Sequence, residues 1–184
     1  MENKRLGIIS GLSAYLLWGT LGVFWELLSV VPAMDTLAYR IVWSLVTISV
    51  VLTFQKSWKE VWHVIIELIQ NHKMGLIILS AFLISINWFL YIDMVTHEQA
   101  TEASLSYYIM PLMNVVVAVI FLHEKLSRSK IVALILVIIG VVILTIQTGS
   151  LPLNTLLMAA TFCFYGLIKK QVPLPATISL TLET

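Results

Sequence analysis

The chain has 184 residues, of which 59% are hydrophobic and only 11% charged, and its mean hydropathy is +0.96. This composition is far from that of an average soluble domain and indicates an integral membrane protein. A net charge of +1 gives no reason to expect a nucleic-acid partner, and a single cysteine, Cys163, excludes a disulfide framework and a thiolate metal cluster.

Six apolar segments follow one another along the chain, and most approach the roughly 20 residues needed to cross a hydrocarbon core of about 30 Å. Because lipid offers no hydrogen bonds, we expect each segment to be a transmembrane helix that satisfies its own backbone. The expected fold class is an all-α integral membrane protein with spans at residues 6–28, 37–54, 74–95, 103–122, 131–146 and 153–168.

Basic residues occupy alternate connections between these spans. Every Lys and Arg except Arg40 lies before the first span, between the second and third, between the fourth and fifth, or after the sixth. The intervening connections, around residues 29–35, 96–101 and 148–151, contain none. Since cationic loops remain cytoplasmic, the pattern predicts a multi-pass protein with its N-terminus in the cytoplasm.

The first span begins after a short basic stretch, as a signal peptide does, but it is longer than a signal core and no Ala-x-Ala cleavage site follows it. We therefore expect an uncleaved helix. Tyr15, Gly19, Gly22 and Glu26 recur along it at helical spacing, which places them on one face.

The segment 55–73 is less apolar than the spans on either side. It interleaves Trp58 and Trp62 with Lys59, Glu60 and His63. This pattern favours an amphipathic helix on the cytoplasmic surface of the membrane. An ordinary polar loop is the alternative.

Arg40 is the one cation outside the alternating pattern. It lies near the outer end of the second span, and three carboxylates share its expected depth: Glu26, Asp93 and Glu102. Ionisable groups within a span usually face a cavity or a partner, so we expect these four residues to form a gating or charge network. The alternatives are an Arg40 side chain that reaches the headgroups and a Glu102 that only stabilises a helix N-terminus.

Polar and aromatic residues gather in the third and fourth spans. A cavity lined by aromatic rings and a few amides suits amphipathic or cationic organic solutes. Interhelical hydrogen bonds for the amides and an interfacial position for the rings are the alternatives. The expected solute-pathway residues are Asn87, Trp88, Tyr91, Tyr107, Tyr108 and Asn114.

No enzymatic motif is present. Two His-Glu pairs lack the second histidine of a zinc-protease motif, and no glycine-rich phosphate loop occurs. We therefore expect no catalytic residue, no metal and no cofactor.

An internal similarity relates the first and sixth spans. Residues 14–21 and 161–168 both place an aromatic residue directly before a glycine, Trp18-Gly19 and Tyr165-Gly166, after apolar residues. The charge pattern gives the two spans opposite orientations, as in the inverted repeats of secondary transporters. Residues 1–150 would then form one five-helix repeat, and residues 151–184 the sixth helix and a truncated tail of a second repeat.

Seven blocks of the sequence, in order along nearly the whole chain, resemble the EamA family and specifically its RarD branch. His123 and Tyr39 are minor departures from that pattern. The resemblance implies membership of the drug/metabolite transporter superfamily, whose members have ten helices in two five-helix repeats. The blocks are residues 14–19, 39–44, 87–91, 102–107, 109–114, 121–126 and 164–169.

The function implied by this resemblance is secondary transport by alternating access in a bacterial inner membrane. The solute would be a small organic metabolite or a drug, since RarD proteins are named for chloramphenicol sensitivity. The partners are then the solute, the lipid bilayer, and either a missing second repeat or a second copy in a homodimer. The alternative is a truncated or accessory membrane protein with no transport activity of its own.

Overall fold

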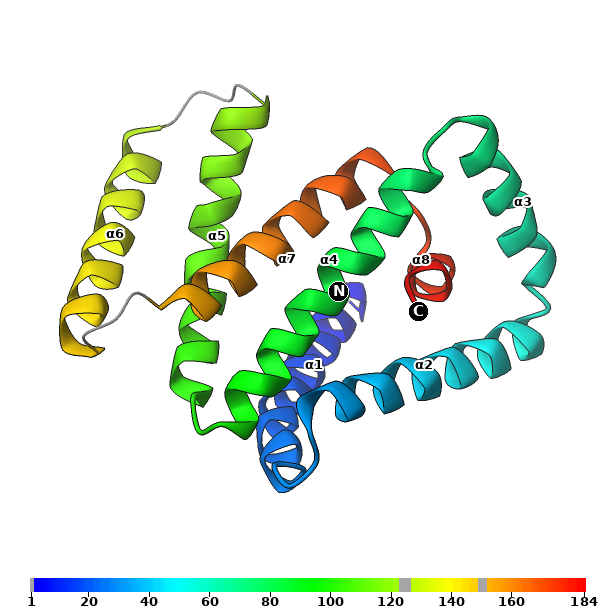
Figure 1. Cartoon of the computed structure of the whole chain (residues 1–184). Helices are drawn as coiled ribbons and strands as arrows, with labels where there is room; N and C mark the ends of the chain where they lie inside the picture. The colour runs from blue at the N-terminus through cyan, green and yellow to red at the C-terminus, as the bar shows by residue number, and fades with distance from the viewer. Residues whose placement is uncertain (1, 123–126, 149–151) are drawn as a thin grey trace.

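The structure is a computed structural model that describes residues 2–122, 127–148 and 152–184, and the regular structure in these ranges is entirely helical (Figure 1). One expected block, residues 121–126, lies largely outside the described residues. The helices are α1 (Glu2–Leu27), α2 (Ala33–Gln55), α3 (Trp58–Gln70), α4 (Met74–Thr96), α5 (Ala100–Leu122), α6 (Arg128–Thr148), α7 (Leu153–Gln171) and α8 (Ala176–Glu183).

Each of the six expected segments coincides with a helix. The segment after the second span also forms a helix, α3, as predicted, and is not a polar loop. Its position on the cytoplasmic surface of the membrane stays a prediction. α8 was not expected; it begins after Pro175, whose φ of −54° suits entry into a helix. Within the described residues, three helices are long and apolar enough to cross a membrane, namely Gly7–Leu27 of α1, α2 and α4. The chain is thus an all-helical, membrane-type protein, and six spans remain a prediction.

Tight turns connect α2 to α3, α3 to α4 and α4 to α5. Each turn contains one residue in the left-handed region: Lys56 and His72, both with φ 55°, and Glu98, with φ 63°. The Lys56 N–H closes the end of α2 by donating to the carbonyl of Thr53 at 3.2 Å. These short turns keep consecutive helices adjacent.

The main core forms where α7 lies across α4 and α5 (Figure 1). Ile92 and Met94 of α4 meet Ala103 of α5 and Met158 and Ala159 of α7, all almost fully buried. The two alanines permit close approach of the helix backbones. α7 therefore joins the two helices that carry most of the expected pathway residues.

A second group of buried residues holds α8 against α2 and α3. Ile48 and Leu52 of α2 pack with Val61 of α3 and Ile178 of α8. α8 lies between α2 and the α4–α7 pair, and it contacts both α2 and α4. The segment that was expected to be the truncated tail of a second repeat thus contains a helix that closes one side of the space between these helices.

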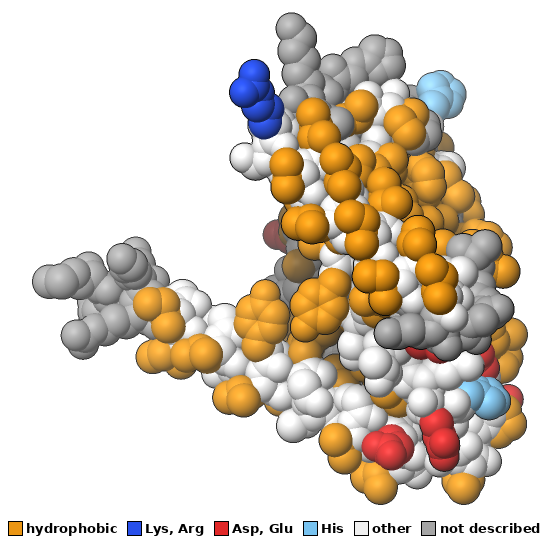
Figure 2. Space-filling view, turned by 90° about the vertical axis from the view of Figure 1, so that its left-hand side faces the viewer, with side chains coloured by type: hydrophobic (Ala, Val, Ile, Leu, Met, Phe, Trp, Pro, Cys, Tyr) orange, Lys and Arg blue, Asp and Glu red, His pale blue; other side chains and the backbone are white. Residues whose placement is uncertain are grey.

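Much of the remaining surface is apolar. α1 projects from the body at the left of Figure 2 and exposes Leu16, Leu17 and Val23. On the face shown in Figure 2, apolar side chains cover the body, and charged side chains gather mainly near its top and bottom. A broad apolar band between charged ends is the surface expected of helices in lipid.

Candidate functional site

Four aromatic side chains from three helices form a continuous cluster near the centre of the structure. The Trp18 ring of α1 lies 6.2 Å from Trp88 of α4 and 6.3 Å from Tyr107 of α5, between centroids. Tyr91 lies 5.9 Å from Trp88 and 6.1 Å from Tyr107. Three of the four contacts are edge-to-face, a geometry that favours attraction between the rings. We call these four residues the aromatic cluster.

The helix positions explain how the cluster forms. Trp88 and Tyr91 are three residues apart on α4 and therefore share a face. α1 reaches them with Trp18, and its glycine at position 22 leaves room beside Tyr91, since a Cβ on Gly22 would lie 3.9 Å from the Tyr91 hydroxyl. The helices α1, α4 and α5 therefore meet at the aromatic cluster, where Gly22 leaves space beside the ring of Tyr91.

Arg40 lies directly on this cluster. It is the eighth residue of α2, about 10 Å along the helix axis from Ala33 at 1.5 Å per residue. Its guanidinium carbon lies 3.0 Å from the ring centroid of Trp88, a cation–π contact. The side chain is half-buried.

The carboxylates expected near Arg40 lie elsewhere. In the part of the chain that the structure describes, no ion pair joins Arg40 to Glu26, Asp93 or Glu102. Asp93 instead faces His97, one turn along α4, at 3.4 Å. The structure therefore does not bring the four residues together as a network, and a gating role for them stays a prediction.

Three cavities surround the aromatic cluster, with volumes of about 1090, 370 and 760 Å³. We call them the large cavity, the central cavity and the α2 cavity. The large cavity lies along α1, α4 and α5, and the face of α1 predicted from the sequence lines it: Tyr15, Gly19, Gly22 and Glu26.

The aromatic cluster and Arg40 separate these cavities. Trp18 lines both the large and the central cavity, whereas Tyr91 and Tyr107 line only the large one and Trp88 only the central one. Arg40 lines both the central and the α2 cavity. Ser44 and Leu180 also line both the central and the α2 cavity, so shared side chains lie between neighbouring cavities.

The two expected pathway amides are engaged in helix packing. Asn87 Nδ2 donates to the Met158 carbonyl of α7 at 2.7 Å and lies 3.3 Å from the Thr161 hydroxyl. Asn114 Oδ1 accepts from the Cys163 thiol at 3.0 Å. Tyr108 lines the large cavity, but 74% of its side chain is exposed. Trp88, Tyr91 and Tyr107 are the expected residues that the structure brings together.

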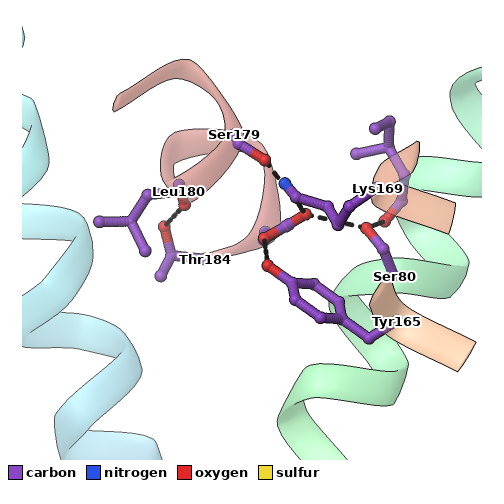
Figure 3. Close-up of polar contacts among 8 residues, drawn as sticks. Ser80, Tyr165, Lys169, Ser179, Leu180 and Thr184 are labelled. Carbon is purple, nitrogen blue, oxygen red and sulfur yellow. Dashed lines mark hydrogen bonds and ion pairs between the residues drawn. The ribbon is translucent and has the colours of Figure 1, made fainter. Parts of the chain in front are cut away.

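A polar network that the sequence did not predict lies on the other side of the central cavity (Figure 3). The Glu183 carboxylate of α8 accepts from Lys169 Nζ at 2.8 Å, from Ser80 Oγ at 3.0 Å and from the Tyr165 hydroxyl at 2.9 Å. Ser179 Oγ adds a fourth contact at 3.2 Å. The Glu183 side chain is 6% exposed and that of Lys169 26%, so a largely buried ion pair joins α8 to α7, and the Ser80 hydrogen bond joins α8 to α4.

Sequence reasoning missed Trp18 and Glu183 for different reasons. Trp18 stands in a family-like block, residues 14–19, and could have been chosen with the other rings. Glu183 carries no local signal, because its contact with Lys169 exists only once the segment containing Pro173 and Pro175 has placed α8 beside α7. Among the described residues, no cluster of His, Cys, Asp or Glu could hold a metal ion.

Comparison with known proteins assigns the family. Residues 5–146 match the EamA-like transporter family. The chain is 44% identical, over its whole length and 61% of the relative's, to the uncharacterized transporter YojE of Bacillus subtilis. It is 41% identical to Protein RarD of Streptomyces exfoliatus, covering 57% of that protein, and 36% identical to Protein RarD of Escherichia coli, covering 61%.

The chain spans about three fifths of the length of these relatives. No solved structure matches it. The family match covers the helices that carry the aromatic cluster and Arg40, and the RarD relatives align over all of the chain, including α7 and α8. The chain belongs to the EamA-like transporter family, within its RarD-like members and the drug/metabolite transporter superfamily.

Proposed function

We propose that the chain is part of a secondary transporter that moves small organic solutes across a bacterial inner membrane by alternating access. One observation carries this proposal: Arg40 and the aromatic cluster separate three adjoining cavities inside a bundle of membrane-type helices. Membership of a transporter family agrees with it and argues against an enzyme.

The aromatic cluster is the proposed barrier on the solute path. Trp18 is 50% exposed and meets the rings of Trp88 and Tyr107, each contact contributing only about 1 kcal/mol, so a rotamer change at Trp18 is inexpensive. Such a change would connect the large cavity to the central cavity. The path would then run past Trp18, Trp88, Tyr91 and Tyr107, with Tyr108 at the exposed rim of the large cavity.

The proposed topology has six spans with the N-terminus in the cytoplasm. The alternating basic connections support it, and the bacterial origin of the relatives supports the inner membrane. Residues 1–150 would form one five-helix repeat, and residues 151–184 the beginning of a second. Because the relatives are longer, the proposed path is completed either by further helices or by a second copy of the chain.

A flux measurement tests this function. The 184-residue chain is reconstituted into liposomes, and entry of phenyl probes with permanent charges, 3-phenylpropane-1-sulfonate and benzyltrimethylammonium, is measured by filtration. We expect protein-dependent flux of at least one probe. Trp88→Leu removes one ring of the proposed barrier, so flux should rise by about tenfold, which corresponds to a barrier lower by about 1.4 kcal/mol.

Trp62→Leu is the matched control, since Trp62 on α3 is 66% exposed and lines none of the three cavities. It should leave flux unchanged. Protein-independent leakage alone, or equal flux in the Trp88 and Trp62 variants, would contradict the proposed path. Absence of flux in a folded, correctly inserted chain would contradict completion of the path by a second copy, and would leave either completion by further helices or a non-transporting membrane protein.

A further inference from the structure

We propose that the α2 cavity is a binding site for the anionic group of a small solute whose body is aromatic or apolar, with Arg40 as its main ligand. The proposal names the substrate class of the transport function above and rests on that function for its physiological role. The binding site itself can be tested without transport.

The lining of the α2 cavity has a positive charge, which favours an anionic ligand. Arg40 is the one charged residue among those that line the α2 cavity. The central cavity beside it contains Arg40 and Glu183, but Lys169 already neutralises Glu183 at 2.8 Å. Both spaces therefore have a net charge of +1, whereas Glu26 and Glu98 make the large cavity negative.

The second step concerns the donors of Arg40. Among the described residues, its guanidinium makes no hydrogen bond and no ion pair; its contact is with the face of Trp88. Cation–π attraction stabilises the charge but leaves the N–H groups of the guanidinium without acceptors. A half-buried cation between membrane-type helices is costly unless an acceptor is present, so an anion would bind favourably.

Two further donors lie in the lining of the same cavity. Trp25 and Thr36 are only 6% and 5% exposed, and in the described part of the chain Trp25 Nε1 and Thr36 Oγ1 are buried without any hydrogen-bond partner. A buried donor without an acceptor is unfavourable, because folding has removed its hydrogen bond to water and supplied none in return. Both residues line the cavity, so a small rotation of either side chain would add its donor to the guanidinium of Arg40, and no carboxylate competes for these donors in this lining.

The other residues of the lining indicate the chemical nature of the rest of the solute, beyond its anionic group. Apart from Arg40 and a few hydroxyls, the cavity lining is aromatic and aliphatic and includes Phe24, Tyr39, Trp43, Ile48 and Val51. A volume of about 760 Å³ accommodates a small organic molecule and is far larger than an inorganic ion needs. An amphipathic carboxylate, sulfonate or phosphate fits both the charge and the surface.

The test compares three phenyl probes that differ in charge: 3-phenylpropane-1-sulfonate, phenyl β-glucoside and benzyltrimethylammonium. Binding to the 184-residue chain in phosphatidylcholine nanodiscs is measured by ligand-observed NMR. Since a hydrogen bond to a charged partner is stronger than a neutral one, we expect the sulfonate to bind at least about tenfold more tightly than the neutral glucoside. Equal affinities of the sulfonate and the neutral glucoside, or no binding of the sulfonate, would overturn the proposal; the cationic probe can also bind in the negative large cavity, so its affinity is compared only between the unmodified chain and the Arg40 variants.

Four variants locate the effect. Arg40→Gln should abolish the preference for the sulfonate, Arg40→Lys should retain part of it, and Thr36→Val should weaken sulfonate binding by about threefold. Arg128→Gln is the control, because Arg128 is exposed at the start of α6 and lines none of the cavities. A preference that survives in a folded Arg40→Gln protein would refute the assignment to this cavity.

Further results distinguish a lipid from a free solute as the source of the anionic group, and distinguish failure of the anion site from failure of transport. If phosphatidylglycerol in the nanodisc displaces the sulfonate, the anionic group belongs to a lipid; if the sulfonate still binds, it belongs to a free solute. Arg40-dependent binding without flux would retain the anion site and contradict transport. Flux of the cationic probe without anion preference would retain transport and contradict the anion site.

Discussion

Lys169 of α7 and Glu183 of α8 form an ion pair at 2.8 Å, although only 6% of the Glu183 side chain is exposed. Fourteen residues and a proline-containing turn separate them in the sequence. The pair fixes α8 beside α4, where Ser80 donates a further hydrogen bond to the same carboxylate. One wall of the central cavity therefore depends on an interaction between α7 and α8.

Removal of the positive partner should destabilise the protein. Lys169→Met leaves the Glu183 carboxylate buried with hydroxyl donors alone, and breaking a buried pair in this way costs roughly 3 kcal/mol. We expect a clear decrease of the thermal midpoint in detergent, followed by circular dichroism. Adding Glu183→Gln should recover much of the loss, because no buried charge then lacks a partner.

Lys170→Met is the matched control for this pair. Lys170 is the next residue on α7 and its side chain is exposed, so the variant should melt like the unmodified protein. Equal destabilisation by both lysine variants would mean that the loss reflects helix α7 in general and not the contact with Glu183.

A second prediction separates the two interpretations of Asn87. The amide is 3% exposed and donates to a carbonyl of α7 at 2.7 Å, so Asn87→Leu should lower stability by about 1 kcal/mol. Flux per folded molecule should remain near normal. Asn114→Leu should have a smaller effect on stability, since a thiol is a weak donor. Loss of flux at unchanged stability would restore Asn87 to the solute path.

Much of the fold followed from the sequence because helices in lipid must satisfy their own backbone, and apolar length alone then locates them. The aromatic residues Trp88, Tyr91 and Tyr107 were identified for a similar reason, as neighbours on their helix faces. The partner of Arg40 was not predicted correctly, because a guanidinium can be stabilised by an aromatic ring as well as by a carboxylate. Helix periodicity does not specify which neighbouring helix supplies that partner.

Helix α8 could not be predicted from the sequence for a different reason. Its eight residues are too few to be recognised as a span, and its buried residues, such as Ile178, become buried only through contact with α2 and α3. The same holds for Glu183, which appears as a terminal polar residue until the tertiary structure places it beside Lys169. Interactions of this kind depend on packing between distant segments and leave no local pattern.

A third prediction uses the glycine face of α1. Nothing lies within 4 Å of a Cβ placed on Gly19, which lines the large cavity. Gly19→Leu should therefore fold normally and fill part of the cavity. We expect flux to fall by about tenfold, or about 1.4 kcal/mol in the barrier, at an unchanged thermal midpoint.

Gly140 on α6 provides the control for this substitution. A Cβ there also meets nothing within 4 Å, and the residue lines none of the three cavities. Gly140→Leu should leave both flux and stability unchanged. If both leucine variants transport normally, the large cavity is not on the solute path.

The last prediction concerns the side of the membrane to which the large cavity opens. Ser29 and Glu98, from the connections that precede α2 and α5, both line this cavity, and those connections lack Lys and Arg. The distribution of charge therefore predicts that the large cavity opens on the external side. Cys163→Ser removes the one cysteine, so single cysteines at Ser29 or at His72, both exposed, can be labelled in intact cells with a membrane-impermeant maleimide. Ser29→Cys should react directly and His72→Cys only after permeabilisation; the reverse pattern would mean that the N-terminus is external and that the large cavity opens to the cytoplasm.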